Sequence, residues 1–502
     1  MRKIMLKICI VPLMLLASCQ DWLDVQPKAE IKLDVMFETE QGFKDALVGC
    51  YIMMSDNSLY GAEMTCTFLD VLAQQYALQG SSSGAYYNAS RYMYTAANCE
   101  SKINAIWSKT YNIIANVNAL IEGLENNRDK LHPSIYAMTK AEAYGIRAYL
   151  YFDLVRLFTW GNLSQRPEVL DKLSLPYVKV YDKGIVVQST LRKVLEYLHA
   201  DLNIALELFD VYDPDSKSGN RPDDYELPND DKFYEAENRV FRMNLKAARA
   251  LEMRIYMWEG NYEEAHKSAV KVEELELKFA TKLDEDERYR DLTFSEEMLF
   301  GLEANKRFDN VVKSYFKLTV ADDANINYDV LYLGNTRVED LYEIKTGIGA
   351  SDWRYTRWWD KSTNDYCFLK FWEYEDMKFI NRVPLIRSSE VYYTLAECIL
   401  RLGKDKDEAI LLLNKVRNAR NIPSSLNLSN ELTSEEVMKE LEKEWRKDFI
   451  GDGQLFYYYK RLGFTSIPNG PAMAYDDNVY VLPMPQLEID FGGREPMVDK
   501  EK

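Results

Sequence analysis

The most distinctive chemistry in this sequence comes from aromatic side chains between residues 353 and 374. These 22 residues include nine aromatic residues, whereas the chain average of 13% predicts about three. Flat rings can pack against the apolar C–H faces of a sugar, and neighbouring charged side chains can bind its hydroxyl groups. Trp353, Trp358 and Trp359 lie beside Arg354 in this window and form a candidate ligand-binding platform. The alternative is that these Trp side chains belong to the hydrophobic core, and the sequence favours neither.

Other aromatic residues divide between the core and a second candidate platform. Residues 367–371 alternate as expected of a β-strand, so Phe368, Phe371 and Trp372 are predicted to pack in the core. The second platform follows residues 80–84, a run of Gly and Ser that is typical of a loop. Its candidate ligand-binding residues are Tyr86, Tyr87, Arg91 and Tyr92.

Motifs of the readily recognised enzyme classes are absent. The sequence has no G-x-S-x-G elbow, no H-E-x-x-H helix and no P-loop. Its three His residues, His132, His199 and His266, are far apart, which leaves little for zinc binding or general-base catalysis. A helical glycoside hydrolase with two catalytic carboxylates is the alternative enzyme class, but 80 acidic residues allow many pairings. The sequence therefore predicts a binding protein with no catalytic residues and no cofactor.

Composition and charge restrict the partners. The formal net charge of −18 and a pI near 4.9 argue against nucleic acid, which needs a basic surface. Residues 213–218 begin like a calcium-binding loop, but Lys217 and Ser218 stand where such a loop needs a ligand and a Gly. No metal site is predicted.

The N-terminus has the pattern of a secretion signal that ends in a lipidation site. Arg2, Lys3 and Lys7 precede a short apolar run at residues 8–17, which is too short to cross a bilayer. The run ends in Leu-Ala-Ser-Cys, the lipobox pattern of bacterial lipoproteins, with Cys19 as the acylated residue. Residues 1–18 are therefore predicted to be a lipoprotein signal peptide, and lipid on Cys19 is predicted to hold the remainder on a membrane.

The remainder of the chain reads as helical hairpins separated by irregular segments. Low Gly and Pro contents, 22 and 15 residues, favour long helices. Hairpin breaks at Gly260 and Gly403 resemble those of tetratricopeptide-type units, which bury their apolar faces by stacking. The predicted repeat-like helices occupy about 103–158, 189–209, 243–276 and 387–420, and the irregular segments about 70–100 and 295–385.

Several short motifs occur in order along the chain. They are Leu23-Asp24-Val25, Ala46-Leu47-Val48-Gly49, Asn118-Ala119-Leu120-Ile121, Arg147-Ala148-Tyr149, Phe152-Asp153-Leu154-Val155, Leu413-Asn414-Lys415-Val416-Arg417 and Leu482-Pro483-Met484-Pro485. Together these motifs resemble the SusD/RagB family of outer-membrane nutrient-binding lipoproteins. The resemblance covers nearly the whole chain after Cys19 and is weakest between about 210 and 385. Trp445 and Leu455 stand where the family has Arg, and Tyr458 stands where it has Asp, which puts a local ion-pair arrangement in doubt.

The resemblance implies a fold and a function. The expected fold is a single α-rich domain over residues 19–502, in which tetratricopeptide-like hairpins form an α-α superhelix. This superhelix packs against an irregular ligand-binding half with few short strands. The expected function is capture of oligosaccharides at the cell surface and delivery to a SusC-like TonB-dependent transporter in the outer membrane. Some members bind peptides instead, which is the main alternative. By the same resemblance, the two aromatic segments contribute loops to the ligand-binding face.

Overall fold

The structure of the protein is a computed structural model. It describes residues 35–79, 84–217, 219, 221–223, 225–228, 231–316, 330–362, 365–374 and 376–498. Cys19 and the predicted signal peptide lie outside the described residues. The helices are α3 (Glu40–Met54), α4 (Phe68–Leu72), α5 (Ala97–Asn126), α6 (Pro133–Phe158), α7 (Leu191–Tyr212), α8 (Leu245–Glu259), α9 (Tyr262–Glu273), α10 (Lys313–Tyr315), α11 (Asn335–Leu341), α12 (Trp353–Arg357), α13 (Ser388–Arg401), α14 (Lys406–Ala419), α15 (Ser434–Asp448), α16 (Leu455–Leu462), α17 (Asp477–Tyr480) and α18 (Gln486–Asp490).

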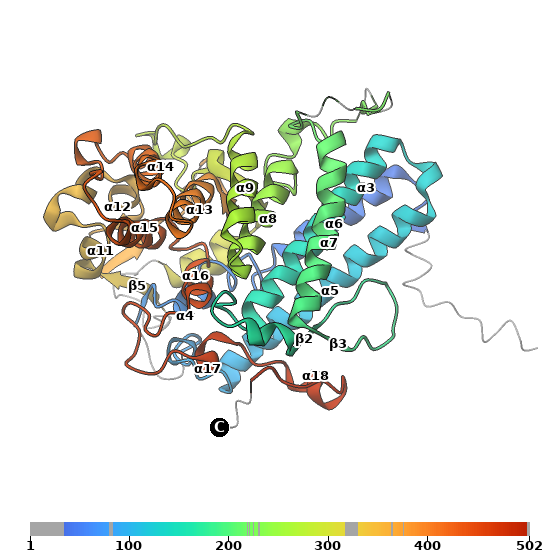
Figure 1. Ribbon diagram of the computed structural model, residues 1–502, viewed down its shortest axis with the longest axis horizontal. Coiled ribbons are helices and arrows are strands. Elements are labelled where there is room, and N and C mark those ends of the chain that lie inside the picture. The colour runs from blue at the N-terminus through green and yellow to red at the C-terminus, as the bar shows by residue number, and fades with distance from the viewer. Residues whose placement is uncertain are drawn as a thin grey trace, which may run out of the picture.

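The long helices form antiparallel pairs, as their sequence periodicity predicts. α5 packs on α6, α6 on α7, α8 on α9 and α13 on α14, and α13 also contacts α9 and α15. In Figure 1, α3, α5, α6 and α7 lie at one end of the molecule, α8 and α9 in the middle, and α11 to α15 at the other end. Gly260 and Gly403, which follow α8 and α13, have positive φ values of 77° and 63° that a side chain disfavours. The prediction of an α-rich fold built from helical hairpins is confirmed.

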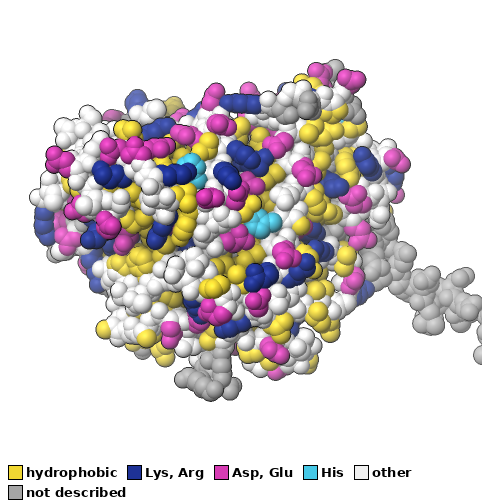
Figure 2. Space-filling model, in the orientation of Figure 1, with side chains coloured by type: hydrophobic (Ala, Val, Ile, Leu, Met, Phe, Trp, Pro, Cys, Tyr) yellow, Lys and Arg dark blue, Asp and Glu magenta, His cyan; other side chains and the backbone are white. Residues whose placement is uncertain are grey.

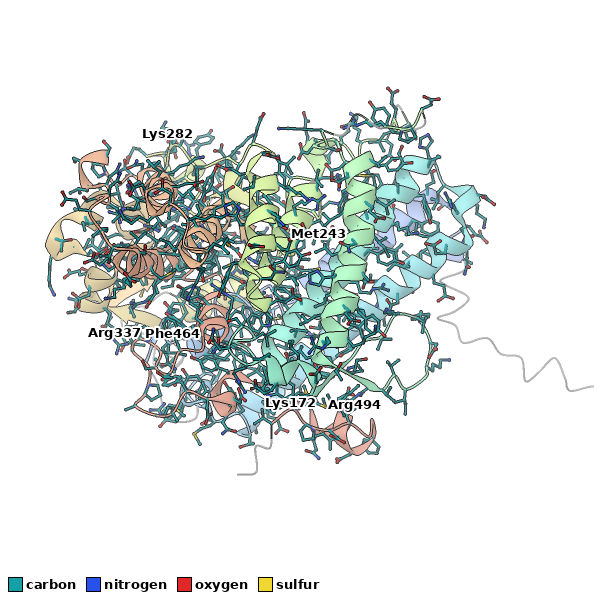
Figure 3. All side chains as sticks on the ribbon, in the orientation of Figure 1. Lys172, Met243, Lys282, Arg337, Phe464 and Arg494 are labelled. Carbon is teal, nitrogen blue, oxygen red and sulfur yellow. The ribbon has the colours of Figure 1, made fainter. Side chains whose placement is uncertain are left out.

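Local sequence determines where these helices start and how they pack. The Thr190 hydroxyl accepts a hydrogen bond from the Lys193 backbone N–H (3.3 Å) and so caps α7, whose buried residues recur every three or four positions. α6 is buried on nearly all sides because it lies among α3, α5, α7 and α8. At Gly145 of α6, a Cβ atom would lie 2.6 Å from the Cγ of Met243, which is labelled among the central helices in Figure 3. The absence of a side chain at Gly145 therefore permits this close approach.

The strands of the described residues are short and lie between the hairpins in the sequence. β1, β5, β7 and β6 form an antiparallel sheet in that order, with Tyr332 of β5 opposite both Ala77 of β1 and Cys367 of β7. Two-stranded sheets pair β2 with β3 and β4 with β8. The strands are β1 (Ala77–Gln79), β2 (Leu173–Pro176), β3 (Gln188–Thr190), β4 (Met298–Glu303), β5 (Val330–Gly334), β6 (Trp359–Asp360), β7 (Asp365–Phe368) and β8 (Arg382–Arg387).

One continuous cluster of buried apolar side chains runs from Phe37 to Met484 and joins the helical hairpins to the irregular segments. The five Cys residues of the described chain are buried and form no disulfide: Cys50, Cys66, Cys99, Cys367 and Cys398. Within the described ranges, no helix combines the length and the apolar character needed to span a membrane. Figure 2 shows acidic and basic side chains interspersed over the face in view.

Candidate functional site

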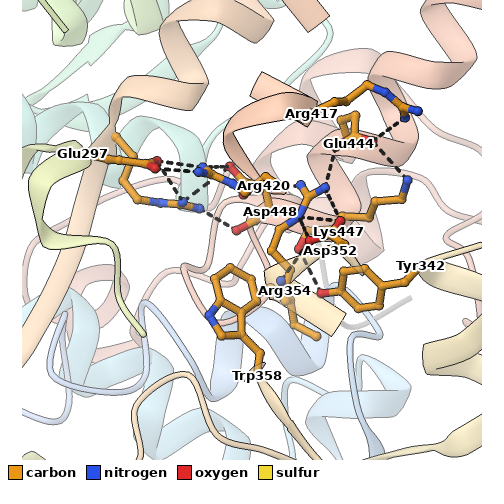
Figure 4. A network of polar contacts seen from close by, with 12 residues as sticks. Glu297, Tyr342, Asp352, Arg354, Trp358, Arg417, Arg420, Glu444, Lys447 and Asp448 are labelled. Carbon is orange, nitrogen blue, oxygen red and sulfur yellow. Dashed lines mark hydrogen bonds and ion pairs between the residues drawn. The ribbon is translucent and has the colours of Figure 1, made fainter. Parts of the chain in front are cut away.

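A network of buried ion pairs encloses part of the first predicted platform (Figure 4). The Arg354 guanidinium has no exposed surface and pairs with Asp352 (2.7 Å), Glu444 (2.8 Å) and Asp448 (3.4 Å). Asp352 precedes α12, whereas Glu444 and Asp448 lie on α15. Arg354 therefore joins the irregular segment to a helical hairpin and offers no atom to a ligand, contrary to its assignment as a candidate ligand-binding residue.

The electrostatics of this network explain why charges can be buried there. Burial alone would raise the pKa of Glu444, but Lys447, Arg354 and Arg417 beside it hold that pKa well below its ordinary value. The pKa of Asp448 is also held well below its ordinary value, because the guanidinium groups of Arg387, Arg420 and Arg354 outweigh the effect of burial. Both carboxylates thus remain charged and paired.

Two of the three Trp residues of this platform belong to the core. Trp358 is fully buried, and its Nε1 donates to the Leu292 carbonyl oxygen (2.8 Å). Trp359 is 3% exposed and packs against Phe368 with 5.1 Å between ring centroids. Only Trp353 is half-buried. For Trp358 and Trp359 the core alternative applies, because a ring enclosed by protein cannot stack on a ligand.

The second predicted platform also contains both buried and partly exposed side chains. Tyr86 and Tyr92 are buried, and the Tyr92 hydroxyl donates to the Leu72 carbonyl oxygen (2.9 Å). Their assignment as ligand-binding residues is not supported by this burial. Tyr87 is half-buried, and the exposed Arg91 places its guanidinium carbon 3.8 Å from the Tyr87 ring centroid. This stacked pair is the part of the predicted platform that a ligand can reach.

A segment that sequence reasoning missed connects the two regions. It consists of a π-helix, η7 (Phe308–Val312), followed directly by α10. Phe308 and Tyr315 are both half-buried, and they contact aromatic rings from the two predicted platform segments. Phe308 lies edge-on to Trp372 (5.1 Å between ring centroids), and Tyr315 lies edge-on to Tyr86 (5.4 Å). We call the half-buried rings of Tyr87, Tyr315, Phe308 and Trp372 the aromatic strip.

A narrow groove with a volume of about 10 Å³, room for one water molecule, lies beside Trp372. Trp372 is half-buried rather than buried, which corrects its prediction as a core residue, whereas Phe368 and Phe371 are in the core as predicted. Trp372, Phe379, Glu373 and Arg382 line the groove, and the Phe379 side chain is 36% exposed. Burial raises the pKa of the Glu373 carboxyl, which accepts a hydrogen bond from the Asn381 backbone N–H (2.6 Å).

The strip and groove together combine flat apolar rings with nearby groups that form hydrogen bonds. Among the described residues, the buried Nε of Arg382 has no hydrogen-bond partner, and Arg91 is exposed beside Tyr87. This arrangement suits a ligand with apolar faces and polar edges.

Family comparisons cover most of the chain. A family model described as "Starch-binding associating with outer membrane" matches residues 21–217, and a model described as "SusD family" matches residues 316–483. A curated relative, SusD-like protein P2 of Formosa agariphila, is 24% identical over 529 residues. The alignment covers 96% of this chain and 96% of that protein.

Solved structures share the fold. A SusD-like carbohydrate binding protein from Bacteroides vulgatus has a TM-score of 0.66 at 16% identity, covering 90% of this chain and 96% of that chain. A SusD superfamily protein from Bacteroides thetaiotaomicron has a TM-score of 0.65 at 21% identity, covering 91% and 98%. The protein thus has the fold of the SusD superfamily. The chain belongs to the SusD/RagB family, a family associated with the outer membrane.

Proposed function

We propose that this protein binds oligosaccharides on the surface of the aromatic strip, with the narrow groove beside Trp372 at its edge. The observation that carries the proposal is a set of half-buried rings on three separate segments, joined by the contacts of Phe308 with Trp372 and of Tyr315 with the buried Tyr86. Arg91 lies beside Tyr87, and Glu373 and Arg382 line the groove beside Trp372. Support comes from the carbohydrate-binding relative of known structure and from the starch-binding description of the matching family model. We expect modest affinity, because a surface site buries only part of a sugar and must order it.

We further propose that the protein is one domain over residues 19–502, anchored in the outer membrane by lipid on Cys19 and facing the cell surface. There it would pass captured glycan to a SusC-like TonB-dependent transporter. Family membership and the continuous core support this assignment. Replacing Cys19 by Ala should move the protein from the membrane fraction to the soluble fraction, and an unchanged fractionation would contradict lipidation.

Affinity electrophoresis against a panel of polysaccharides tests glycan binding, with release of reducing sugar assayed in parallel. We expect retardation by at least one polysaccharide and no sugar release. The double variant Phe308→Ala/Trp372→Ala should migrate as it does without polysaccharide. Tyr181→Ala is the matched control, because this Tyr is 41% exposed but lies outside the strip. Sugar release would indicate the helical glycoside hydrolase alternative, and binding of peptides with no glycan retardation would indicate a peptide-binding family member.

A further inference from the structure

A second cavity lies among the helices, separate from the aromatic strip and lined by none of its residues. It is enclosed by side chains from α6, α8, α13, α15 and α16, and every lining residue except Arg461 is buried. The rings of Trp445 and Tyr458 form part of its wall, where they stack with 4.9 Å between centroids and 25° between planes. These are two of the three positions at which the sequence departs from the family pattern of charged residues.

Four buried polar groups of the lining residues have no hydrogen-bond partner among the residues that the structure describes. They are the Nη1 of Arg254, the indole Nε1 atoms of Trp258 and Trp445, and the hydroxyl of Tyr457. The side chains of Trp258, Trp445 and Tyr457 are 2%, 6% and 4% exposed. Buried polar groups in native proteins are nearly always hydrogen-bonded, and an indole N–H can only donate. The missing partner must therefore supply acceptor atoms.

The charges on the wall favour an acceptor that carries negative charge. Arg156, Arg254 and Arg461 line the cavity, whereas Glu390 is the one acidic residue in its described lining. Carboxylates already pair with each guanidinium: Asp153 with Arg156, Glu390 with Arg254 and Glu397 with Arg461. Among the described atoms of these three guanidinium groups that face the protein interior, the Nη1 of Arg254 is a buried charged donor with no hydrogen-bond partner. The protein's own carboxylates are thus engaged while two indole donors are not.

The size of the cavity limits the ligand to a few atoms. The cavity volume is about 40 Å³, and a single water molecule requires roughly 10–15 Å³ by the same measure. About three water-sized groups would fit, so a sugar ring is excluded and a planar oxyanion with three heavy atoms is accommodated. We propose that this cavity is a binding site for a small monovalent carboxylate, held by the indole N–H groups of Trp258 and Trp445 and the hydroxyl of Tyr457.

Titration calorimetry with sodium formate tests this proposal. Ionic strength is held constant with sodium sulfate, whose anion is too large for the cavity. Trp258→Phe and Trp445→Phe each remove one donor and keep an aromatic ring, so each should weaken formate binding roughly tenfold or more. Trp107→Phe is the matched control, because its Nε1 donates to Glu488 (3.0 Å) outside the cavity, and it should bind formate as the unmodified protein does.

A crystal structure of the unmodified protein grown with formate decides the outcome if either variant fails to fold. Formate within hydrogen-bond distance of both indole nitrogen atoms supports the proposal. Ordered water at both nitrogen atoms despite the added formate would overturn it, as would formate affinity that is equal in all variants. Glycan retardation should be unchanged in Trp258→Phe, so failure of this site and failure of the proposed glycan site are distinguishable.

Discussion

Two aromatic-rich regions of this protein differ in how far their side chains are buried. The segment from Trp353 to Trp359 contains three Trp and two Arg residues, and most of their side chains are buried. The aromatic strip contains one Trp, one Phe and two Tyr residues, and all four remain half-exposed. The difference lies in their partners. Arg354 pairs with carboxylates of α15, whereas the described contacts of Arg91 are with Tyr87 and Ser90. Aromatic density alone therefore does not identify a binding surface.

The strongest test of the buried region is Arg354→Ala. This change leaves Asp352, Glu444 and Asp448 without one of their buried cationic partners, and breaking a buried ion pair from one side costs about 3–5 kcal/mol. We expect a loss of that size in the free energy of unfolding measured by urea denaturation.

Arg357→Ala provides the matched control for this test. Arg357 pairs with Glu285, whose side chain is 82% exposed, and exposed pairs contribute less than about 1 kcal/mol. Equal stability of Arg354→Ala and Arg357→Ala would mean that the network does not stabilise this region.

Acid should also lower the free energy of unfolding through this network, by a somewhat smaller amount. A carboxylate whose pKa is depressed in the folded state stabilises the fold above its unfolded pKa of about 4, and this contribution is lost as the pH falls further. Glu444 and Asp448 both have depressed pKa values. We expect the free energy of unfolding to fall below about pH 4, by on the order of 2–3 kcal/mol for one such group.

Glu444→Gln separates this contribution from general acid effects. The variant lacks one titrating group, so its stability should depend less steeply on pH below about pH 4 than that of the unmodified protein. Superimposable pH profiles, measured by urea denaturation at each pH, would exclude Glu444 as a source of acid sensitivity.

In the aromatic strip, Trp372→Ala should affect binding rather than folding. Trp372 is half-buried beside the groove, and Trp is enriched among the residues whose truncation costs more than about 1 kcal/mol at a binding surface. We therefore expect a loss of about 1.4 kcal/mol, or about tenfold in affinity. Affinity electrophoresis measures this change, and thermal unfolding checks the fold. A large drop in melting temperature with unchanged affinity would mean that Trp372 stabilises the fold and does not contact the ligand.

The smallest expected effect comes from Arg91→Ala. Its guanidinium stacks on Tyr87, and an exposed cation–π contact contributes about 0.5–1 kcal/mol, so affinity should fall about two- to fivefold. Lys267→Ala is a suitable control for loss of a surface cation, because Lys267 is exposed on α9, outside the strip, and pairs with Glu264 (2.6 Å). An equal effect of both changes would indicate general electrostatics rather than a contact at Tyr87.

The helical hairpins could be predicted from sequence because their signals are local. Apolar residues at intervals of three and four, with Gly260 and Gly403 at the breaks, determine those helices with little help from the rest of the chain. The burial of Arg354 could not be predicted in this way, since its partners on α15 follow about 90 residues later. Phe308 and Tyr315 were missed because a π-helix joined to a single α-turn gives no sustained 3.6-residue period.

The sequence did locate one feature of the helical region without revealing its chemistry. Trp445 and Tyr458 were identified as departures from an expected pairing of charged residues. In the structure they form a stacked aromatic pair on the wall of the second cavity. A departure from a family pattern locates an altered position in the chain. Its chemistry depends on neighbours from other helices, here Trp258 and Tyr457, which the sequence does not identify.

The buried ion-pair network also has a consequence for the order of folding. Its contacts join residues that are distant in the chain, including Arg420 with Glu297, 123 positions apart, and Arg354 with Glu444, 90 positions apart. Closing such long loops costs entropy before any contact compensates for it, so these pairs should form after the local hairpins have assembled. Interactions absent from the folding transition state act mainly on the unfolding rate. The network should therefore lower the unfolding rate of the protein far more than it raises the folding rate.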